Sequence, residues 1–182
     1  MQSHIDDLLH QGWIRPCRGP WSSKIILAPK EPHQEHIHDI TNFVWHFCIN
    51  YCPLNTITCP FEYPIPHCDN ALDNFGDSHG TLHFISFDCK TGFHQIAVCE
   101  QDQEKLAFVC PDGSKHCYTI MPFGPMNAPA TYTAMMFIMK TEYDTLFHTQ
   151  YPDSWSKVSG KIIMDDGLLW AKDDPMLTLH YF

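Results

Sequence analysis

The chain has 182 residues, of which 44% are hydrophobic, and a formal net charge of -10. That length fits one or two compact units with a real hydrophobic core. No apolar run reaches the roughly 18 residues of a membrane span, and the first residues lack the basic and then apolar pattern of a signal peptide. Composition therefore favours a cytoplasmic or nuclear protein over a membrane-spanning or secreted one.

Nine cysteines are spread through the chain. Their odd number and the length of the chain argue against a secreted disulfide scaffold, so we expect reduced thiols. Residues 35–38 (Glu-His-Ile-His) and the pair Cys48 and Cys52 are possible zinc ligands. Because no two cysteines have CxxC spacing, a structural zinc site is not expected.

The N-terminal part of the chain alternates apolar and polar segments. Apolar residues at helical spacing predict a short amphipathic helix over residues 5–11, which Gly12 can end. The elements that follow are a strand over residues 24–29, a polar loop over 30–42, a strand over 43–51, and a mostly extended, proline-punctuated stretch over 52–66.

The rest of the chain continues with helices and strands in irregular order. The predicted elements are a short helix over residues 67–76, an apolar strand over 81–88, a hairpin over 105–121 about a turn at 111–114, a long helix over 128–147, and a hairpin over 162–170. This order favours an α+β fold with a mostly antiparallel sheet.

Two adjacent aspartates, Asp165 and Asp166, lie inside the apolar run KIIMDDGLLWA. One interpretation is a hairpin turn at Asp166-Gly167, because turn positions need residues that tolerate positive φ. The other is that both carboxylates lie at the end of a sheet, where a divalent cation neutralises them. Mg²⁺ prefers oxygen ligands from one or two carboxylates together with substrate phosphates. The run alone does not decide between the two interpretations.

Asp88 is a candidate third acid, since it ends the apolar strand over residues 81–88. Taken alone, it is better explained as a helix N-cap after a strand. If its strand pairs with the one that leads into Asp165, two carboxylates converge at one edge of a sheet. That arrangement is a two-metal site for in-line phosphoryl transfer.

Five segments, in order along the chain, resemble those of one enzyme family. FDCKTGFHQI, MPFGPMNAPATY and IIMDDGLLWA resemble the three central motifs of the reverse transcriptases of gypsy-class LTR retrotransposons. GWIRPCRGPWSSKIILAPK and FVWHFCINYCPLNTIT resemble the preceding fingers segments of the same family. The resemblance covers essentially the whole chain and implies an RNA-directed DNA polymerase.

The resemblance also implies the right-hand polymerase fold, an α+β architecture with an antiparallel palm sheet. It assigns residues 1–80 to the N-terminal part of the fingers and 81–98 to the palm with the first acidic motif. It then assigns residues 99–120 to a fingers hairpin and 121–182 to the palm with the catalytic Asp-Asp hairpin. On this alignment the thumb is absent.

The family pattern implies specific roles for residues of this sequence. Asp88, Asp165 and Asp166 match the catalytic, metal-ligating aspartates, and the ions implied are two Mg²⁺, with Mn²⁺ as an alternative. The positions implied to contact the nucleotide are Lys30, His46, Phe93, Pro122, Phe123 and Gly124. Phe93 matches the aromatic residue that closes over the sugar and selects deoxynucleotides, and Lys30 and His46 match cations that contact the triphosphate.

The implied partners are an RNA or DNA template with its primer, deoxynucleoside triphosphates, and the remainder of a polyprotein with a thumb, RNase H and integrase. The implied location is a cytoplasmic virus-like particle or the nucleus. No membrane is implied.

Several positions depart from the family pattern. His46 replaces the usual Arg, Ile163 stands where many relatives have an aromatic residue, and relatives commonly have a basic residue at Cys52, Cys59 and His67. With only two Arg in an acidic chain, a simple nucleic-acid-binding patch is not expected. Three hypotheses follow: a reverse transcriptase core, a catalytically decayed polymerase-fold remnant that acts only in binding, or a metal-binding protein.

Overall fold

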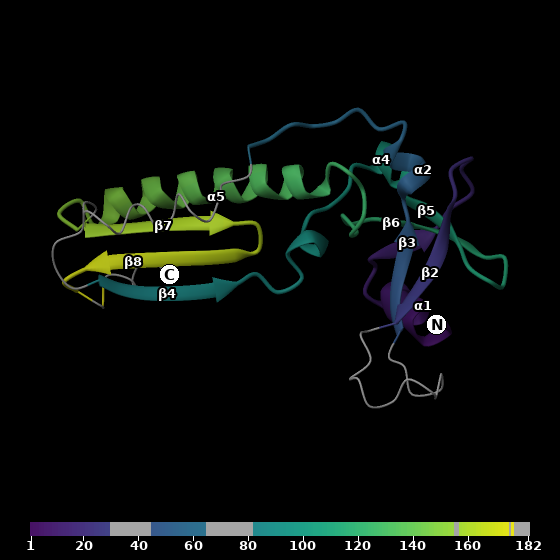
Figure 1. Cartoon of the computed structure of the whole chain (residues 1–182), viewed down its shortest axis with the longest axis horizontal. Helices are drawn as coiled ribbons and strands as arrows, with labels where there is room; N and C mark the ends of the chain where they lie inside the picture. The colour runs from purple at the N-terminus through teal and green to yellow at the C-terminus, as the bar shows by residue number, and fades with distance from the viewer. Residues whose placement is uncertain (30–44, 65–81, 155–156, 175, 177–182) are drawn as a thin grey trace. The chain divides into compact units, whose positions relative to one another are not determined.

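The structure is a computed structural model, and it describes residues 1–29, 45–64, 82–154, 157–174 and 176. The chain divides into two compact units (Figure 1). The first unit comprises Met1–Pro60 and Phe93–Ala128, and the second comprises Phe61–Gly92 and Pro129–Phe182. Each unit is therefore built from two separate stretches of the chain.

The first unit begins with helix α1, Gln2–His10. Its apolar face buries Ile5 and Leu8, and Gly12 follows the helix with a φ of +71°, a conformation that glycine adopts without steric cost. The helix predicted over residues 5–11 is confirmed, but it begins earlier, at Gln2.

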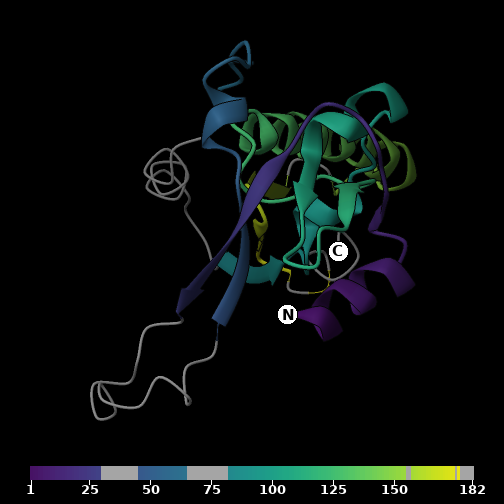
Figure 2. The ribbon, with the colours of Figure 1, turned by 90° about the vertical axis from the view of Figure 1, so that its right-hand side faces the viewer.

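A five-stranded sheet forms the body of the first unit, with the order β1-β6-β5-β2-β3. All its pairs are antiparallel except β2 with β5, which is parallel. Figures 1 and 2 both show β2 and β3 side by side. The strands are β1 (Ile14–Pro16), β2 (Ser23–Pro29), β3 (Trp45–Asn50), β5 (Ala107–Val109) and β6 (Lys115–Tyr118). The strands predicted over residues 24–29 and 43–51 and the hairpin over 105–121 are confirmed within the described residues.

The core of the first unit joins helix α1 to this sheet. Tyr51 and Phe108 are 2% and 0% exposed and belong to one cluster with Ile5 and Leu8. The Tyr51 hydroxyl donates a hydrogen bond of 3.1 Å to the carbonyl of Leu106, which satisfies a polar group that would be costly to bury alone.

The expectation that residues 52–66 are mostly extended is wrong at its start. Residues Cys52–Asn55 form a helical turn, α2. Proline at the second position, Pro53, has a φ already suited to the first turn of a helix. The Asn50 side chain accepts a 3.0 Å hydrogen bond from the Cys52 N–H. Proline therefore starts a helix here instead of excluding one.

Short helices precede β5 along the chain. They are the 3-10 helix η2 (Gly92–Gln95), the α-helix α4 (Glu100–Gln103) and the 3-10 helix η3 (Glu104–Leu106).

The second unit is a three-stranded antiparallel sheet with the order β4-β8-β7. Its strands are β4 (Leu82–Asp88), β7 (Val158–Ile163) and β8 (Asp166–Lys172). Helix α5, Ala128–Gln150, runs along this sheet (Figure 1). Phe147 of α5 packs in one cluster with Val158, Leu169 and Ala171. The α+β class, the antiparallel sheet and the long helix predicted over residues 128–147 are confirmed.

Some predictions fall on residues that the structure does not describe. These are the loop over residues 30–42, the short helix over 67–76, and the side chains of Lys30 and His67. Among the described residues, no helix combines the length and apolar character that a membrane crossing requires.

Candidate active site

The turn between β7 and β8 lies at Met164-Asp165, since Ile163 and Asp166 are paired in the sheet. The interpretation of Asp166-Gly167 as the turn is therefore wrong. Met164 has a φ of +57°, which fits the first position of a two-residue hairpin loop of type II′. That position normally takes glycine, so the sequence gives no signal for a turn here.

Gly167 has a different role, which is to admit the ring of Phe87. A Cβ added at Gly167 would lie 2.0 Å from Phe87 Cζ. The two residues are direct partners across β4 and β8. Glycine is thus needed at Gly167 for close approach of an aromatic ring, not for a turn.

The three acidic residues meet at one end of the β4–β8 pair. Asp88 and Asp166 are cross-strand partners, and directly opposite residues in an antiparallel pair have Cβ atoms about 4.5–5.5 Å apart. Asp165 lies in the adjoining turn, where its carbonyl accepts a 2.8 Å hydrogen bond from the Cys89 N–H. The Asp88 strand was expected to pair with the strand that leads into Asp165, and this is wrong: β4 pairs with β8, the strand that follows Asp165, and β7 lies on the far side of β8. Asp88 still lies opposite Asp166, because β8 begins at the Asp-Asp turn.

A cavity of about 510 Å³ opens at this end of the sheet and is lined by both Asp88 and Asp166. The side chains of Asp88 and Asp166 are exposed and that of Asp165 is half-buried. Among the described residues, no group of three His, Cys, Asp or Glu side chains is close enough to hold one metal ion. A pair of carboxylates still suits Mg²⁺, because that ion usually takes one or two protein carboxylates and completes its shell with water and phosphate.

Tyr132 of α5 is a further part of this site that was not expected from the sequence. Its side chain is 3% exposed, and burial raises the pKa of its hydroxyl, with further increases from the Cys89 side chain and the charges of Asp165 and Asp88. A Cβ at Gly92 would lie 2.3 Å from the Tyr132 hydroxyl oxygen. Tyr132 therefore stays a neutral phenol beside the acidic residues.

The first unit contains the other described residues that the resemblance implies for the nucleotide. Phe93 is 6% exposed, and its ring centroid lies 4.9 Å from that of Phe123. Phe123 itself is 61% exposed. Gly124 has a φ of +105°, which L side chains rarely adopt. The Pro122–Gly124 segment thus presents one aromatic ring to solvent and supports it on another.

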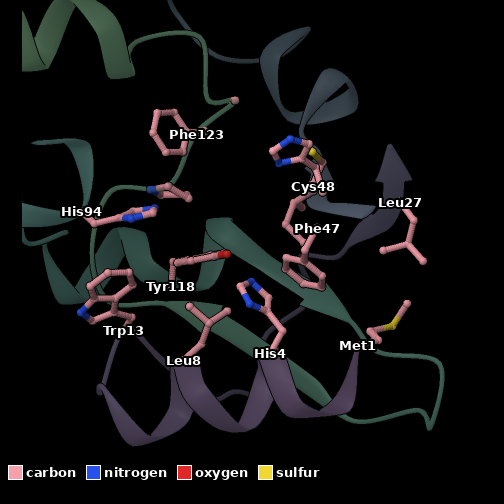
Figure 3. A pocket seen from close by; sticks show the side chains of 14 residues that line it. Met1, His4, Leu8, Trp13, Leu27, Phe47, Cys48, His94, Tyr118 and Phe123 are labelled. Carbon is pink, nitrogen blue, oxygen red and sulfur yellow. The ribbon is translucent and has the colours of Figure 1, made fainter. Parts of the chain in front are cut away.

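A cavity of about 780 Å³ lies beside this segment, and His46 is among the residues that line it. His94 lines it as well (Figure 3). The ring of His94 lies between those of Trp13 and Phe123, with centroid distances of 4.7 and 5.2 Å. Its Nδ1 is buried and has no hydrogen-bond partner among the described residues, and burial lowers the pKa of His94.

The possible zinc ligands in the described part of the chain do not form a site. Cys48 and Cys52 are both exposed free thiols, and they belong to no group of three potential ligands among the described residues. Residues 35–38 lie outside the described residues.

A family model described as "Reverse transcriptase (RNA-dependent DNA polymerase)" matches residues 32–172. The chain belongs to the reverse transcriptase family. Two similar relatives are the Retrovirus-related Pol polyproteins from the Drosophila melanogaster transposons opus and gypsy. They are 35% and 31% identical over 136 and 132 residues, which is 75% and 72% of this chain. The match covers only 13% and 12% of those polyproteins.

Solved structures show the same fold. The prototype foamy virus protease-reverse transcriptase matches 99% of this chain with a TM-score of 0.65 and 21% identity, and the match covers 20% of that chain. A foamy viral protease-reverse transcriptase in complex with dsDNA matches with a TM-score of 0.66 and 20% identity, over 99% of this chain and 32% of that one. The reverse transcriptase fold and the gypsy-type resemblance are confirmed, and membership of this family implies a divalent metal in general.

Proposed function

We propose that this chain is the core of an RNA-directed DNA polymerase from a retrotransposon polyprotein. It would add deoxynucleotides to the 3′ end of a primer on an RNA or DNA template. The observation that supports this most is the acidic end of the β4–β8 pair, with Asp88 opposite Asp166 and Asp165 in the adjoining turn. Because the chain belongs to the reverse transcriptase family, we interpret these acidic residues as the catalytic site for nucleotide addition.

Asp88, Asp165 and Asp166 are the residues that would hold two Mg²⁺ ions, with Mn²⁺ as the alternative. Bound there, the ions would stabilise the attacking and leaving oxygens of an in-line displacement at phosphorus. The donor set suits them, since all three residues offer carboxylate oxygens and two of the three side chains are exposed.

The chain's own residues orient this site. The Cys89 N–H binds the Asp165 carbonyl, which connects the end of β4 to the turn that presents the carboxylates. Tyr132 keeps its proton next to both Asp88 and Asp165 because burial and the two charges raise its pKa. A neutral phenol adds no charge to a site that already concentrates negative charge, and it remains a hydrogen-bond donor.

Nucleotide binding is assigned to Lys30, His46, Phe93 and the Pro122–Gly124 segment. For Phe93 the assignment is selection of the sugar: a flat ring against the 2′ position excludes ribonucleotides. Phe93→Val should then admit ribonucleotides while deoxynucleotide use falls less. An unchanged preference would mean that Phe93 is only a core residue, as its 6% exposure would also allow.

The partners follow from the same proposal. They are a template with its primer, deoxynucleoside triphosphates, and the remainder of a polyprotein with a thumb, RNase H and integrase. The location would be a cytoplasmic virus-like particle or the nucleus. A related foamy viral enzyme is described in complex with dsDNA, which supports a nucleic-acid partner for this chain.

The deciding experiment is primer extension on an RNA template, with Mg²⁺ and then Mn²⁺. Extension by the parent chain and its loss in Asp165→Asn, with the variant still folded, would support the proposal. Binding of primer–template without extension under either ion would instead support the decayed remnant that acts only in binding.

A further inference from the structure

Lys161 is the one cation that lines the acidic cavity among the described residues. It lies on β7, where it pairs with Leu168, and Ile163 pairs with Asp166. On β4, Ser86 pairs with the same Leu168 and Asp88 with Asp166. Side chains alternate between the faces of a sheet, so the rows Ile163–Asp166–Asp88 and Lys161–Leu168–Ser86 share one face. We call this face the acidic face.

The opposite face belongs to α5 and differs in character. Ile162 and Leu169 line a mostly apolar cavity there together with Met136 and Met139 of the helix. The only cation lining that cavity among the described residues is Lys140, which is already paired with Asp144 at 2.6 Å. Lys161 is therefore directed to the side of the sheet that holds the acids, which is the side opposite α5.

Within the described ranges, no side chain pairs with the ammonium group of Lys161. The side chain is half-buried, yet within the described part of the chain it forms no hydrogen bond and no ion pair, even though Asp166 is its diagonal neighbour across β7 and β8. Diagonal neighbours are about 7–8 Å apart, within reach of a long side chain. A lysine that lies near carboxylates without forming an ion pair with them is available to bind an anionic ligand.

We propose that Lys161 binds a backbone phosphate of the primer–template on the acidic face. This inference rests on the proposed polymerase function. Lys161 precedes the acidic row by two residues, or about 7 Å along the strand, and the backbone of a duplex advances about 3.4 Å per nucleotide. The proposal takes the duplex axis to run along β7, in which case the phosphate that Lys161 meets belongs to the polymer, about two nucleotides from the reacting end, and not to the incoming nucleotide.

The overall charge of the chain gives this contact weight. With a formal net charge of -10 and two Arg, the chain has few groups that can neutralise phosphates. Each neutralised phosphate releases counterions, so its contribution appears in the salt dependence of binding. The contact made by one lysine on the acidic face should therefore be a measurable part of the salt dependence of duplex binding.

The test is binding of a labelled primer–template duplex, without nucleotides, by the parent chain, Lys161→Gln, Lys161→Arg and Lys172→Gln. Lys172 is the matched control, because it is half-buried on the same face of the sheet but lies at the other end of β8, opposite Leu82. Affinity is measured from roughly 50 to 200 mM salt, where one phosphate contact changes the slope of log K against log salt by about 0.9. Thermal melts confirm that each variant is folded.

We expect Lys161→Gln to make the slope of log K against log salt shallower by about 0.9. Over that fourfold salt range, the loss of affinity with salt should then be about 3.5-fold smaller than in the parent chain. Lys161→Arg should restore the slope and Lys172→Gln should leave it unchanged. Equal losses in Lys161→Gln and Lys172→Gln, an unchanged slope in Lys161→Gln, or an effect confined to the KM for nucleotides would each overturn the inference. A parent chain that binds no duplex would overturn the polymerase proposal as well, whereas an unchanged slope in a binding-competent variant defeats only the role of Lys161.

Discussion

The β5–β6 hairpin and the β7–β8 hairpin are built on different kinds of turn residues. The β5–β6 hairpin of the first unit turns through residues that suit a turn: Gly113 has a φ of +84°, and Asp112 accepts hydrogen bonds of 2.9 and 2.7 Å from the Ser114 N–H and hydroxyl. The β7–β8 hairpin of the second unit turns through Met164 at positive φ and Asp165. Neither residue is there for the turn.

The difference in turn residues indicates a different role for each hairpin. A left-handed conformation costs a non-glycine residue about 1–2 kcal/mol, and such strain persists where the surroundings fix it, often at functional sites. The first hairpin joins two strands at little cost. The second places a carboxylate at the end of a sheet, and its turn is shaped by that requirement.

The largest expected effect is on primer extension, which should depend on the β7–β8 turn and not on the β5–β6 turn. Asp165→Asn should lower primer extension by on the order of 10²–10³-fold or more, as expected when a group that stabilises transition-state charge is removed. Asp112→Asn, the matched change in the other turn, should leave extension unchanged. Single-turnover rates measure both, and comparable losses in the two variants would mean that the β7–β8 turn has no special role.

The next effect concerns one glycine at each hairpin, Gly113 inside the β5–β6 turn and Gly167 just after the β7–β8 turn. Gly167→Ala should destabilise by about 1–3 kcal/mol because its methyl group would overlap the Phe87 ring. Gly113→Ala has nothing within 4 Å of the new methyl group, so it should cost only its backbone strain. Urea unfolding measures both free energies.

A double-mutant cycle separates the two causes. Phe87→Leu should recover part of the loss in Gly167→Ala, with a coupling of about 0.5–3 kcal/mol, and should recover nothing in Gly113→Ala. Additive behaviour of Gly167→Ala and Phe87→Leu would show that the close approach is not what requires glycine.

A smaller effect is expected from relaxing the strained turn. Met164→Gly removes the cost of a positive φ but adds the entropy of glycine, about 0.5–1 kcal/mol, so the net gain in stability should be below about 1 kcal/mol. Extension should fall at the same time, because a freer turn holds Asp165 less firmly. A variant that is both more stable and as active would show that the strain has no part in positioning Asp165.

The smallest effect is the pH dependence of the regular turn. Hydrogen bonds from Ser114 lower the pKa of Asp112 below its ordinary value of 3.8. A lowered pKa in the folded state gives stability that is present above the unfolded pKa and is lost as pH falls through the folded one. The difference in stability between the parent and Asp112→Ala should therefore be constant near neutral pH and shrink below about pH 4. A difference that does not change with pH would rule out the ionised carboxylate as its source.

Sequence patterns predicted the elements that depend on local signals. The hairpin over residues 105–121 and the helix over 128–147 appear where apolar periodicity and the Pro-Asp-Gly-Ser turn put them. An apolar strand that ends on Asp88 was also expected, because the alternation of apolar residues before this acid is evident in the sequence. Its partner was not predicted correctly, since β4 pairs with β8 and not with the strand that leads into Asp165. The catalytic and nucleotide-binding roles of these residues stay predictions.

What the sequence could not predict depends on contacts between distant segments. The turn was expected at Asp166-Gly167 because glycine normally signals a turn, yet Gly167 is required by the Phe87 ring on another strand. Tyr132 reads as one more apolar residue of a long helix, and only the packing of α5 brings its hydroxyl to Gly92 and the acidic residues. Likewise, the face to which Lys161 belongs is set by the β7–β8 register, which a one-residue slip would reverse.

The split composition of the first unit has a consequence for how the protein is made. Strand β1 pairs with β6, and Ile14 meets Tyr118 across a sequence separation of 118 − 14 = 104 residues. At a synthesis rate of about 5–20 residues per second, β6 is synthesised roughly 5–20 s after β1, and β1 has no partner strand during that time. The chain between them includes β4, whose own partner β8 is made later still. Long-range pairing of this kind slows folding and prolongs the exposure of unpaired strand edges, so we expect the nascent chain to depend on chaperones that bind apolar strands.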